Sequence, residues 1–174
     1  MVLLMAKIAN ASGLTIGVDG VANPANVTLV PSNTAIISVI SDGTEMADVP
    51  AFLVMSGPGT ASFNLDAVTN NININKPPGT SVFFWTEDYP YGAVFMDIAV
   101  AVPEIPLLPP GVMVDNIVLR CDSIGDVTLS LYLDRTPIGG VFQLMDTQVI
   151  HQIIPEPITV ALLGLGALFL RRRK

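Results

Sequence analysis

Short runs of apolar and β-branched residues, each closed by turn-forming residues, recur along most of this chain. Residues 14–18 read LTIGV and end at an Asp-Gly turn, and residues 51–55 read AFLVM and end at the breaker cluster SGPG. Alternation with a period of two, as in the first run, is typical of a strand that buries one face. No helix of ordinary length fits between the breaker clusters, so the pattern predicts strands.

The runs are numerous enough to predict a two-layered fold. Strands are expected over residues 14–18, 27–30, 35–40, 51–55, 61–65, 81–85, 93–102, 113–121, 127–133 and 141–153. A break in the last run near Asp146 stays open, and residues 70–75 fit either a loop or an edge strand. Roughly nine or ten short strands separated by turn signals favour two antiparallel sheets packed face to face. The expected fold class is all-β, an antiparallel β-sandwich or jelly roll.

A different pattern closes the chain. Residues 158–170 read ITVALLGLGALFL, thirteen residues without a charge, and RRRK follows at once. As a helix they would span about 20 Å, against a hydrocarbon core of about 30 Å, which predicts a short transmembrane helix. Its main apolar residues are Ile158, Leu162, Leu163, Leu165, Leu168, Phe169 and Leu170. The alternative, a buried C-terminal helix, must explain an apolar surface all round and two central glycines.

Charged and proline-rich segments flank this apolar stretch. The basic cluster Arg171, Arg172, Arg173 and Lys174 should stay on the cytoplasmic side, which places the preceding chain on the opposite side. Before the stretch, Pro155-Glu156-Pro157 favours extended backbone, because proline lacks an N–H and restricts the residue before it. Extended, accessible backbone beside a membrane segment suits a processing enzyme.

Pro-Glu-Pro, then an apolar helix containing LLGLGALFL, then RRRK resembles the PEP-CTERM sorting signal of bacterial surface proteins. The resemblance covers residues 155–174. It implies export by the secretory machinery, recognition of the tail by an exosortase in the membrane, and removal of the tail near the motif. The protein would be associated with the inner membrane before processing and then lie at the cell surface or outside the cell. Such proteins typically accompany exopolysaccharide or biofilm production.

The N-terminus contains part of an export signal. MVLLMA supplies six apolar residues, and Ala9-Asn10-Ala11 fits a cleavage site, but the basic region that should come first is missing. We expect residues 1–11 to be the remnant of a truncated signal peptide. The domain organisation expected is therefore a partial signal peptide (1–11), a β-sandwich (12–153) and the sorting signal (154–174).

Two late strands suggest a family for the body. GVMVDNIVLRC at 111–121 and GDVTLSL at 125–131 resemble the late strands of cohesin-like and related carbohydrate-binding sandwich modules. The resemblance implies a cohesin-like sandwich whose partner is a dockerin-type module or a glycan such as exopolysaccharide. No binding motif of these families is found for transfer to individual residues.

Charge and cysteine content exclude nucleic-acid binding and an internal disulfide. Residues 1–157 hold four Lys/Arg against fifteen Asp/Glu, a formal charge of −11. Such a surface lacks the basic patch that nucleic-acid binding requires, so no nucleic-acid partner is expected. The single cysteine, Cys121, excludes an internal disulfide and is expected to be a small buried apolar residue.

The sequence contains few residues or motifs that indicate catalysis. His151 is the only histidine, and no G-x-S-x-G motif is present. Carboxylates for glycoside hydrolysis are available by type only. Asp122 and Asp126 beside a turn are weak calcium candidates, although ordinary turn chemistry explains them as well. No catalytic residue, cofactor or established metal site is expected.

Aromatic residues are concentrated in one segment. Five of the eleven aromatic residues lie between Phe83 and Tyr91. Core packing is favoured for the Phe and Trp residues, whereas a loop at 89–92 would display Tyr89 and Tyr91 for stacking against a sugar. The function expected is a non-catalytic exported surface protein of the extracellular matrix or exopolysaccharide layer. The alternative is a binding module, cohesin-like or carbohydrate-binding, and an envelope enzyme is the third reading.

Overall fold

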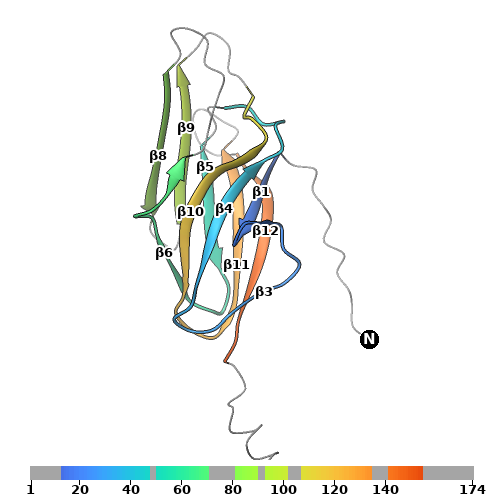
Figure 1. The fold of residues 1–174 in the computed structure, drawn as a ribbon, viewed down its shortest axis with the longest axis vertical. Coiled ribbons are helices and arrows are strands. Elements are labelled where there is room, and N and C mark those ends of the chain that lie inside the picture. Colours follow the sequence, from blue (N-terminus) through green and yellow to red (C-terminus); the bar gives the residue numbers. More distant parts are fainter. Residues whose placement is uncertain are drawn as a thin grey trace, which may run out of the picture.

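The computed structural model describes residues 13–47, 50–70, 81–89, 93–101, 107–134 and 141–154. These residues form two β-sheets that lie face to face as the layers of a sandwich (Figure 1). The all-β sandwich expected from the alternating pattern is confirmed. The expected C-terminal helix lies outside the described residues, as do residues 1–11.

The first sheet has the strand order β2-β1-β4-β10-β6, and β7 also pairs with β10. Every pair in it is antiparallel. Its strands are β1 (Leu14–Val18), β2 (Val21–Ala22), β4 (Thr34–Ser41), β6 (Ala61–Asn64), β7 (Thr69–Asn70) and β10 (Gly111–Cys121).

The second sheet has the order β3-β12-β11-β5-β9-β8. Its strands are β3 (Val27–Leu29), β5 (Ala51–Ser56), β8 (Ser81–Tyr89), β9 (Ala93–Ala101), β11 (Gly125–Asp134) and β12 (Phe142–Gln152). One pair departs from the antiparallel expectation, because β3 lies parallel to the end of β12, with Val27 opposite Ile150 and Leu29 opposite Gln152.

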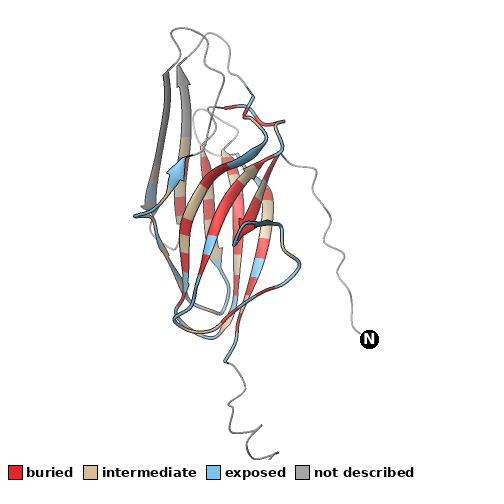
Figure 2. Cartoon of the chain, viewed as in Figure 1, coloured by how far each residue is buried: buried red, intermediate tan, exposed pale blue. Residues whose placement is uncertain are grey.

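The core lies between the sheets, and alternation along the strands fills it. Buried and more exposed residues alternate along β4, β10 and β12 (Figure 2), as the period of two requires. The largest fully buried side chains come from both sheets: Ile16, Ile37, Leu53, Val94, Met113, Ile117, Leu119, Leu129, Leu131, Leu133, Met145 and Ile150. Cys121 is fully buried among them, as expected, and burial raises the pKa of its thiol.

Three register shifts occur along the long strands. In β10 the pairing with β4 shifts between Val112 and Val114 and again between Val114 and Ile117. Asn116, within the second shift, takes a positive φ of 63°, a conformation that asparagine tolerates better than most residues. In β12 the pairing with β11 skips Met145. The adjacent Asp146 carboxylate accepts a hydrogen bond from the Ile16 N–H at 2.9 Å and thus ties β12 to the first sheet.

These observations refine the expected strands. β12 runs unbroken through Asp146, where the sequence left a break open, because the bulge absorbs the irregularity within a continuous ladder. β8 extends to Tyr89, four residues beyond the expected end at residue 85, because β9 pairs with it as far as Ala93. Residues 69–70 form the short strand β7 at the edge of β10, and residues 71–80 lie outside the described part.

Candidate functional site

Four aromatic side chains form a row across the outer face of the second sheet. Phe52 on β5 lies opposite Tyr132 on β11 and opposite Phe95 on β9. The ring centroids of Phe52 and Phe95 are 5.1 Å apart, and those of Phe52 and Phe142 on β12 are 5.4 Å apart at nearly a right angle. Both distances lie in the range of attractive aromatic pairs. We call Phe52, Phe95, Tyr132 and Phe142 the aromatic row.

Strand alternation places the row on the outside of the sandwich. On β5 the buried residues are Ala51 and Leu53, so Phe52 and Val54 face outward. The same alternation on β11 buries Leu131 and Leu133 and turns Tyr132 outward. Phe142 is 54% exposed, which is unusual for a large apolar side chain on a sheet.

A shallow groove runs along the row. Phe52, Val54, Tyr132 and Phe142 line it, and its volume is about 270 Å³. All four lining residues are apolar or aromatic, and Leu144 continues the exposed apolar surface beside Tyr132. An exposed apolar surface of this kind is typical of a binding site rather than of ordinary protein surface.

Two carboxylates lie near the groove on the described strands. Glu87 lies opposite Phe95 in the sheet register, and Asp134 lies opposite Phe142. None of the six strands of this sheet contains a lysine or arginine. Within the described residues, the groove is therefore apolar along its floor, with Glu87 and Asp134 near its margins.

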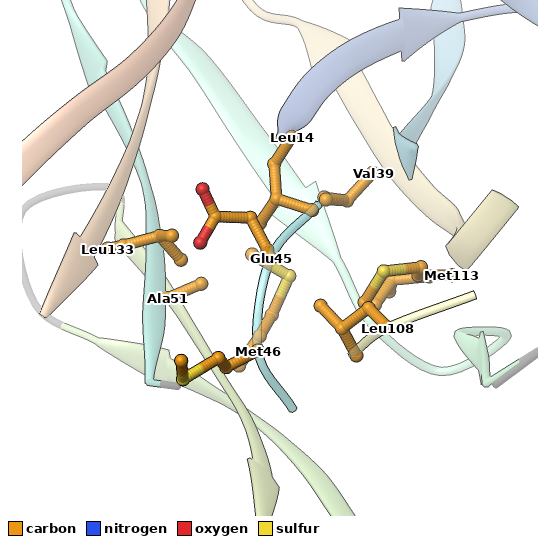
Figure 3. A pocket seen from close by; sticks show the side chains of 10 residues that line it. Leu14, Val39, Glu45, Met46, Ala51, Leu108, Met113 and Leu133 are labelled. Carbon is orange, nitrogen blue, oxygen red and sulfur yellow. The ribbon is translucent and has the colours of Figure 1, made fainter. Parts of the chain in front are cut away.

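A second cavity is closed and small. Figure 3 shows the side chain of Glu45 between Leu14, Ala51 and Leu133, with Met113 and Leu108 on the other side. Glu45 is only 7% exposed, and its carbonyl accepts a hydrogen bond from Leu108 N–H at 2.7 Å. The cavity has a volume of about 20 Å³, close to what a single water occupies. It leaves no room for an organic substrate.

The two calcium candidates each face a basic side chain. The Asp122 carboxylate lies 3.6 Å from Arg120 Nε, and the Asp126 carboxylate lies 2.9 Å from His151 Nδ1. The described residues contain no group of three or more His, Cys, Asp or Glu side chains placed to hold a metal ion. His151 lies on β12 between the buried Ile150 and Gln152, so its side chain faces outward.

The glycan-stacking candidates remain predictions. Tyr89 is the last residue of β8 and pairs with Ala93, so its backbone belongs to a strand rather than to the expected loop. Tyr91 lies outside the described residues. The aromatic row was not predicted, because its members are spread over ninety residues and only the strand order brings them together. The sole signal in the sequence is that each occupies an outward position of a strand.

The sorting signal itself lies outside the described residues. This holds for Pro155, Glu156 and Pro157, for the apolar residues from Ile158 to Leu170, and for the basic cluster. Within the described residues no helix is long and apolar enough to cross a membrane. The last hydrogen bond of the described chain joins Ile153 N–H to the Leu29 carbonyl at 2.9 Å, two residues before Pro155.

Solved cohesin modules are similar to this chain in structure. A type III cohesin module from the cellulosomal ScaE cell-surface anchoring scaffoldin of Ruminococcus flavefaciens is 10% identical, with a TM-score of 0.49, and the match covers 83% of this chain and 89% of the module. A cohesin module from a Clostridium perfringens family 33 glycoside hydrolase is 10% identical, with a TM-score of 0.44 and coverage of 82% and 99%. The third ScaB cohesin of R. flavefaciens, solved with a group 1 dockerin, is 9% identical, with a TM-score of 0.46 and coverage of 85% and 99%. These likenesses concern the fold alone.

The tail gives the more specific comparison. No curated protein matches the chain in sequence. Residues 154–174, however, match the PEP-CTERM protein-sorting motif. The match confirms the sorting signal expected from the Pro-Glu-Pro, apolar and basic segments. The chain therefore carries a PEP-CTERM sorting signal, which implies an exported protein anchored at the membrane before its tail is processed.

Proposed function

We propose that this is a non-catalytic surface protein, exported, processed by an exosortase at its PEP-CTERM signal, and retained in the extracellular matrix or exopolysaccharide layer. The observation that carries the proposal is the match of residues 154–174 to the sorting motif. The end of β12 at Gln152 supports it, because Pro155-Glu156-Pro157 begins three residues later, just outside the last described strand.

The described surface favours a non-catalytic role. The histidine at position 151 is engaged with Asp126, and the closed cavity at Glu45 is the size of one water. Of the acidic residues available for glycoside hydrolysis, Glu87 and Asp97 lie on the neighbouring strands β8 and β9, whereas Asp115 lies on β10 of the other sheet. A hydrolase of that class needs two carboxylates facing each other across a substrate cleft.

Processing is tested by the mass of the envelope protein. In cells with an active exosortase, the mature protein should be smaller than the 174-residue chain, and deletion of the exosortase should leave the tail attached. Replacing Pro155 and Glu156 by alanine should also block processing, whereas Val141→Ala, a surface change far from the tail, should not. Full-length protein in an exosortase-competent envelope would refute the proposal.

The aromatic row supports a second candidate, a binding module. Its tilted rings and purely apolar groove suit the apolar side chains of a protein better than a sugar, which needs a flat ring and polar groups beside it. Glu87, exposed beside the row, favours a partner that carries lysine or arginine next to its apolar residues. A dockerin-type module remains one proposed partner and exopolysaccharide the other.

Retention of the full chain distinguishes the two partners. Immobilised exopolysaccharide and immobilised dockerin-bearing proteins are presented in parallel to the wild-type chain and to Phe142→Ala. Loss of retention in the variant, on one support only, would identify the partner class. Lack of retention of the wild type on both would leave a passive matrix role and contradict the binding module.

A further inference from the structure

The chain leaves the sandwich at an end closed by short, hydrogen-bonded loops, at the bottom of Figure 1. We call this the exit end and define it as residues 30–33, 57–60, 122–124 and 153–154. Asp122 N–H and Ser123 N–H donate to the Thr60 carbonyl, Ser32 N–H donates to the Cys121 carbonyl, and Ile153 N–H donates to the Leu29 carbonyl. These bonds hold the loops and the exit strand together as one surface.

The exit end carries three exposed isoleucines and a single charged residue. Ile124, Ile153 and Ile154 are 53%, 49% and 65% exposed. Asp122 is its single charged residue, and Arg120 lies 3.6 Å away. Asp126 on β11, two residues beyond Ile124, is also paired, with His151.

The length of chain between this end and the apolar stretch is short. Ile154 and Ile158 are four residues apart, so even fully extended backbone separates them by no more than about 14 Å. The headgroup layer on each side of a bilayer is about 5–8 Å thick. A thirteen-residue helix is also about 10 Å shorter than the hydrocarbon core, and such a mismatch draws the flanking residues toward the membrane.

We propose that the exit end is a membrane-facing surface, with Ile124, Ile153 and Ile154 inserted in the headgroup layer of the bilayer that holds residues 158–170. This rests on the proposed function, in which the tail occupies the membrane before processing. Isoleucine gains by leaving water, and the paired charges avoid the repulsion that an acidic surface meets at anionic headgroups. The long axis of the sandwich then stands away from the membrane, and the aromatic row on its side stays open to a partner.

Labelling from the lipid tests the orientation. The full chain is inserted into phosphatidylcholine–phosphatidylglycerol vesicles that carry a phospholipid with a photoactivatable diazirine near its headgroup, and the adducts are located by peptide mass spectrometry. We expect adducts on Ile124 and on residues 153–154 in addition to the tail. Ile124→Asp should lower the adducts at the exit end by roughly fivefold relative to the tail, the effect of losing about half the burial of one isoleucine.

Matched variants keep the test decisive. Val141→Asp places the same charge on a 58% exposed residue just before β12, at the other end of that strand, and should leave the labelling unchanged. Ile153→Asp provides a second variant at the exit end should Ile124→Asp fold poorly. Adducts confined to the tail, or crosslinks of the exit end to a second copy in place of lipid, would overturn this inference and leave the proposed sorting intact. A tail without adducts would overturn both.

Discussion

Both faces of the second sheet carry apolar residues, but the two faces use them differently. On β5, Leu53 is fully buried against the first sheet, while its neighbour Phe52 faces outward in the aromatic row. The same relation holds on β11 between Leu131 and Tyr132. The inner face is explained by the sandwich, which needs a core. The outer face is not, and its apolar groove is therefore the part of the body that points to a binding role.

The largest expected effect lies on the inner face. Leu131→Ala removes a fully buried side chain from the middle of β11 and should lower the free energy of unfolding by about 2–5 kcal/mol, because the cavity left behind collapses only in part. Chemical denaturation measures the loss. A change below about 1 kcal/mol would mean that the two sheets are packed less tightly than the burial indicates.

The next effect concerns Gly57, just after β5, where the backbone passes close to that of Asp126. A Cβ on Gly57 would collide with the Asp126 carbonyl, and the φ of 126° is unfavourable for any other residue. Gly57→Ala should destabilise by about 2–4 kcal/mol. Gly20→Ala is the matched control, since Gly20 also has a positive φ, 78°, but no atom within 4 Å of a Cβ, and it should lose clearly less. Equal losses would show that the close approach is unimportant.

A smaller effect on stability is expected on the outer face. Phe52→Ala removes two aromatic contacts from a solvent-facing surface and should cost about 0.5–1.5 kcal/mol by denaturation. The Phe52→Ala variant should lose most of its retention on an immobilised partner although it stays folded. Ile36→Ala, at a residue 41% exposed on the first sheet, should leave retention unchanged. If Phe52→Ala lowered the free energy of unfolding as much as Leu131→Ala, the outer face would contribute to stability as the inner face does, which would contradict this prediction.

The smallest effect concerns a turn that belongs to neither face. The Thr44 hydroxyl and N–H both donate to Asp42, at 2.6 and 2.9 Å, and hold the pKa of this exposed carboxyl below 3.8. The stability from this pair is present above the unfolded pKa and is lost as the pH falls through the lower, folded pKa. Thr44→Val should raise the pKa of Asp42 in an NMR titration, and Thr60→Val should not move it.

The sequence predicts the buried, inner face of the strands but not the aromatic row on the outer face, for a physical reason. Burial imposes a period of two, so runs such as residues 14–18 and 127–133 were predictable as strands. The outer face of a sheet carries no such requirement, and the neighbours of Phe52 depend on strand order, which the local pattern does not determine. β3 illustrates the same limit: three residues predict a strand, but not that it pairs in parallel with the end of β12.

The tail was predictable because its order of segments is read locally. Pro-Glu-Pro, an apolar stretch and a basic cluster follow one another without any long-range contact, and the match of residues 154–174 confirms that reading. The concentrated aromatic residues at 83–91 were a weaker guide. Their clustering along the chain drew attention to Tyr89 and Tyr91, whereas the contacts observed on the described surface join aromatic residues from separate strands.

The position of β12 has a mechanical consequence. Any tether attached behind Ile154 pulls on this strand along its own axis, and β12 is flanked by β11 over ten residue pairs and by β3 over three more. A pull along the strand strains these ladder bonds together, in shear, whereas a pull across it would open them one after another. A sandwich held through this terminus therefore meets flow or cell contact with the ladder bonds of β12 loaded together.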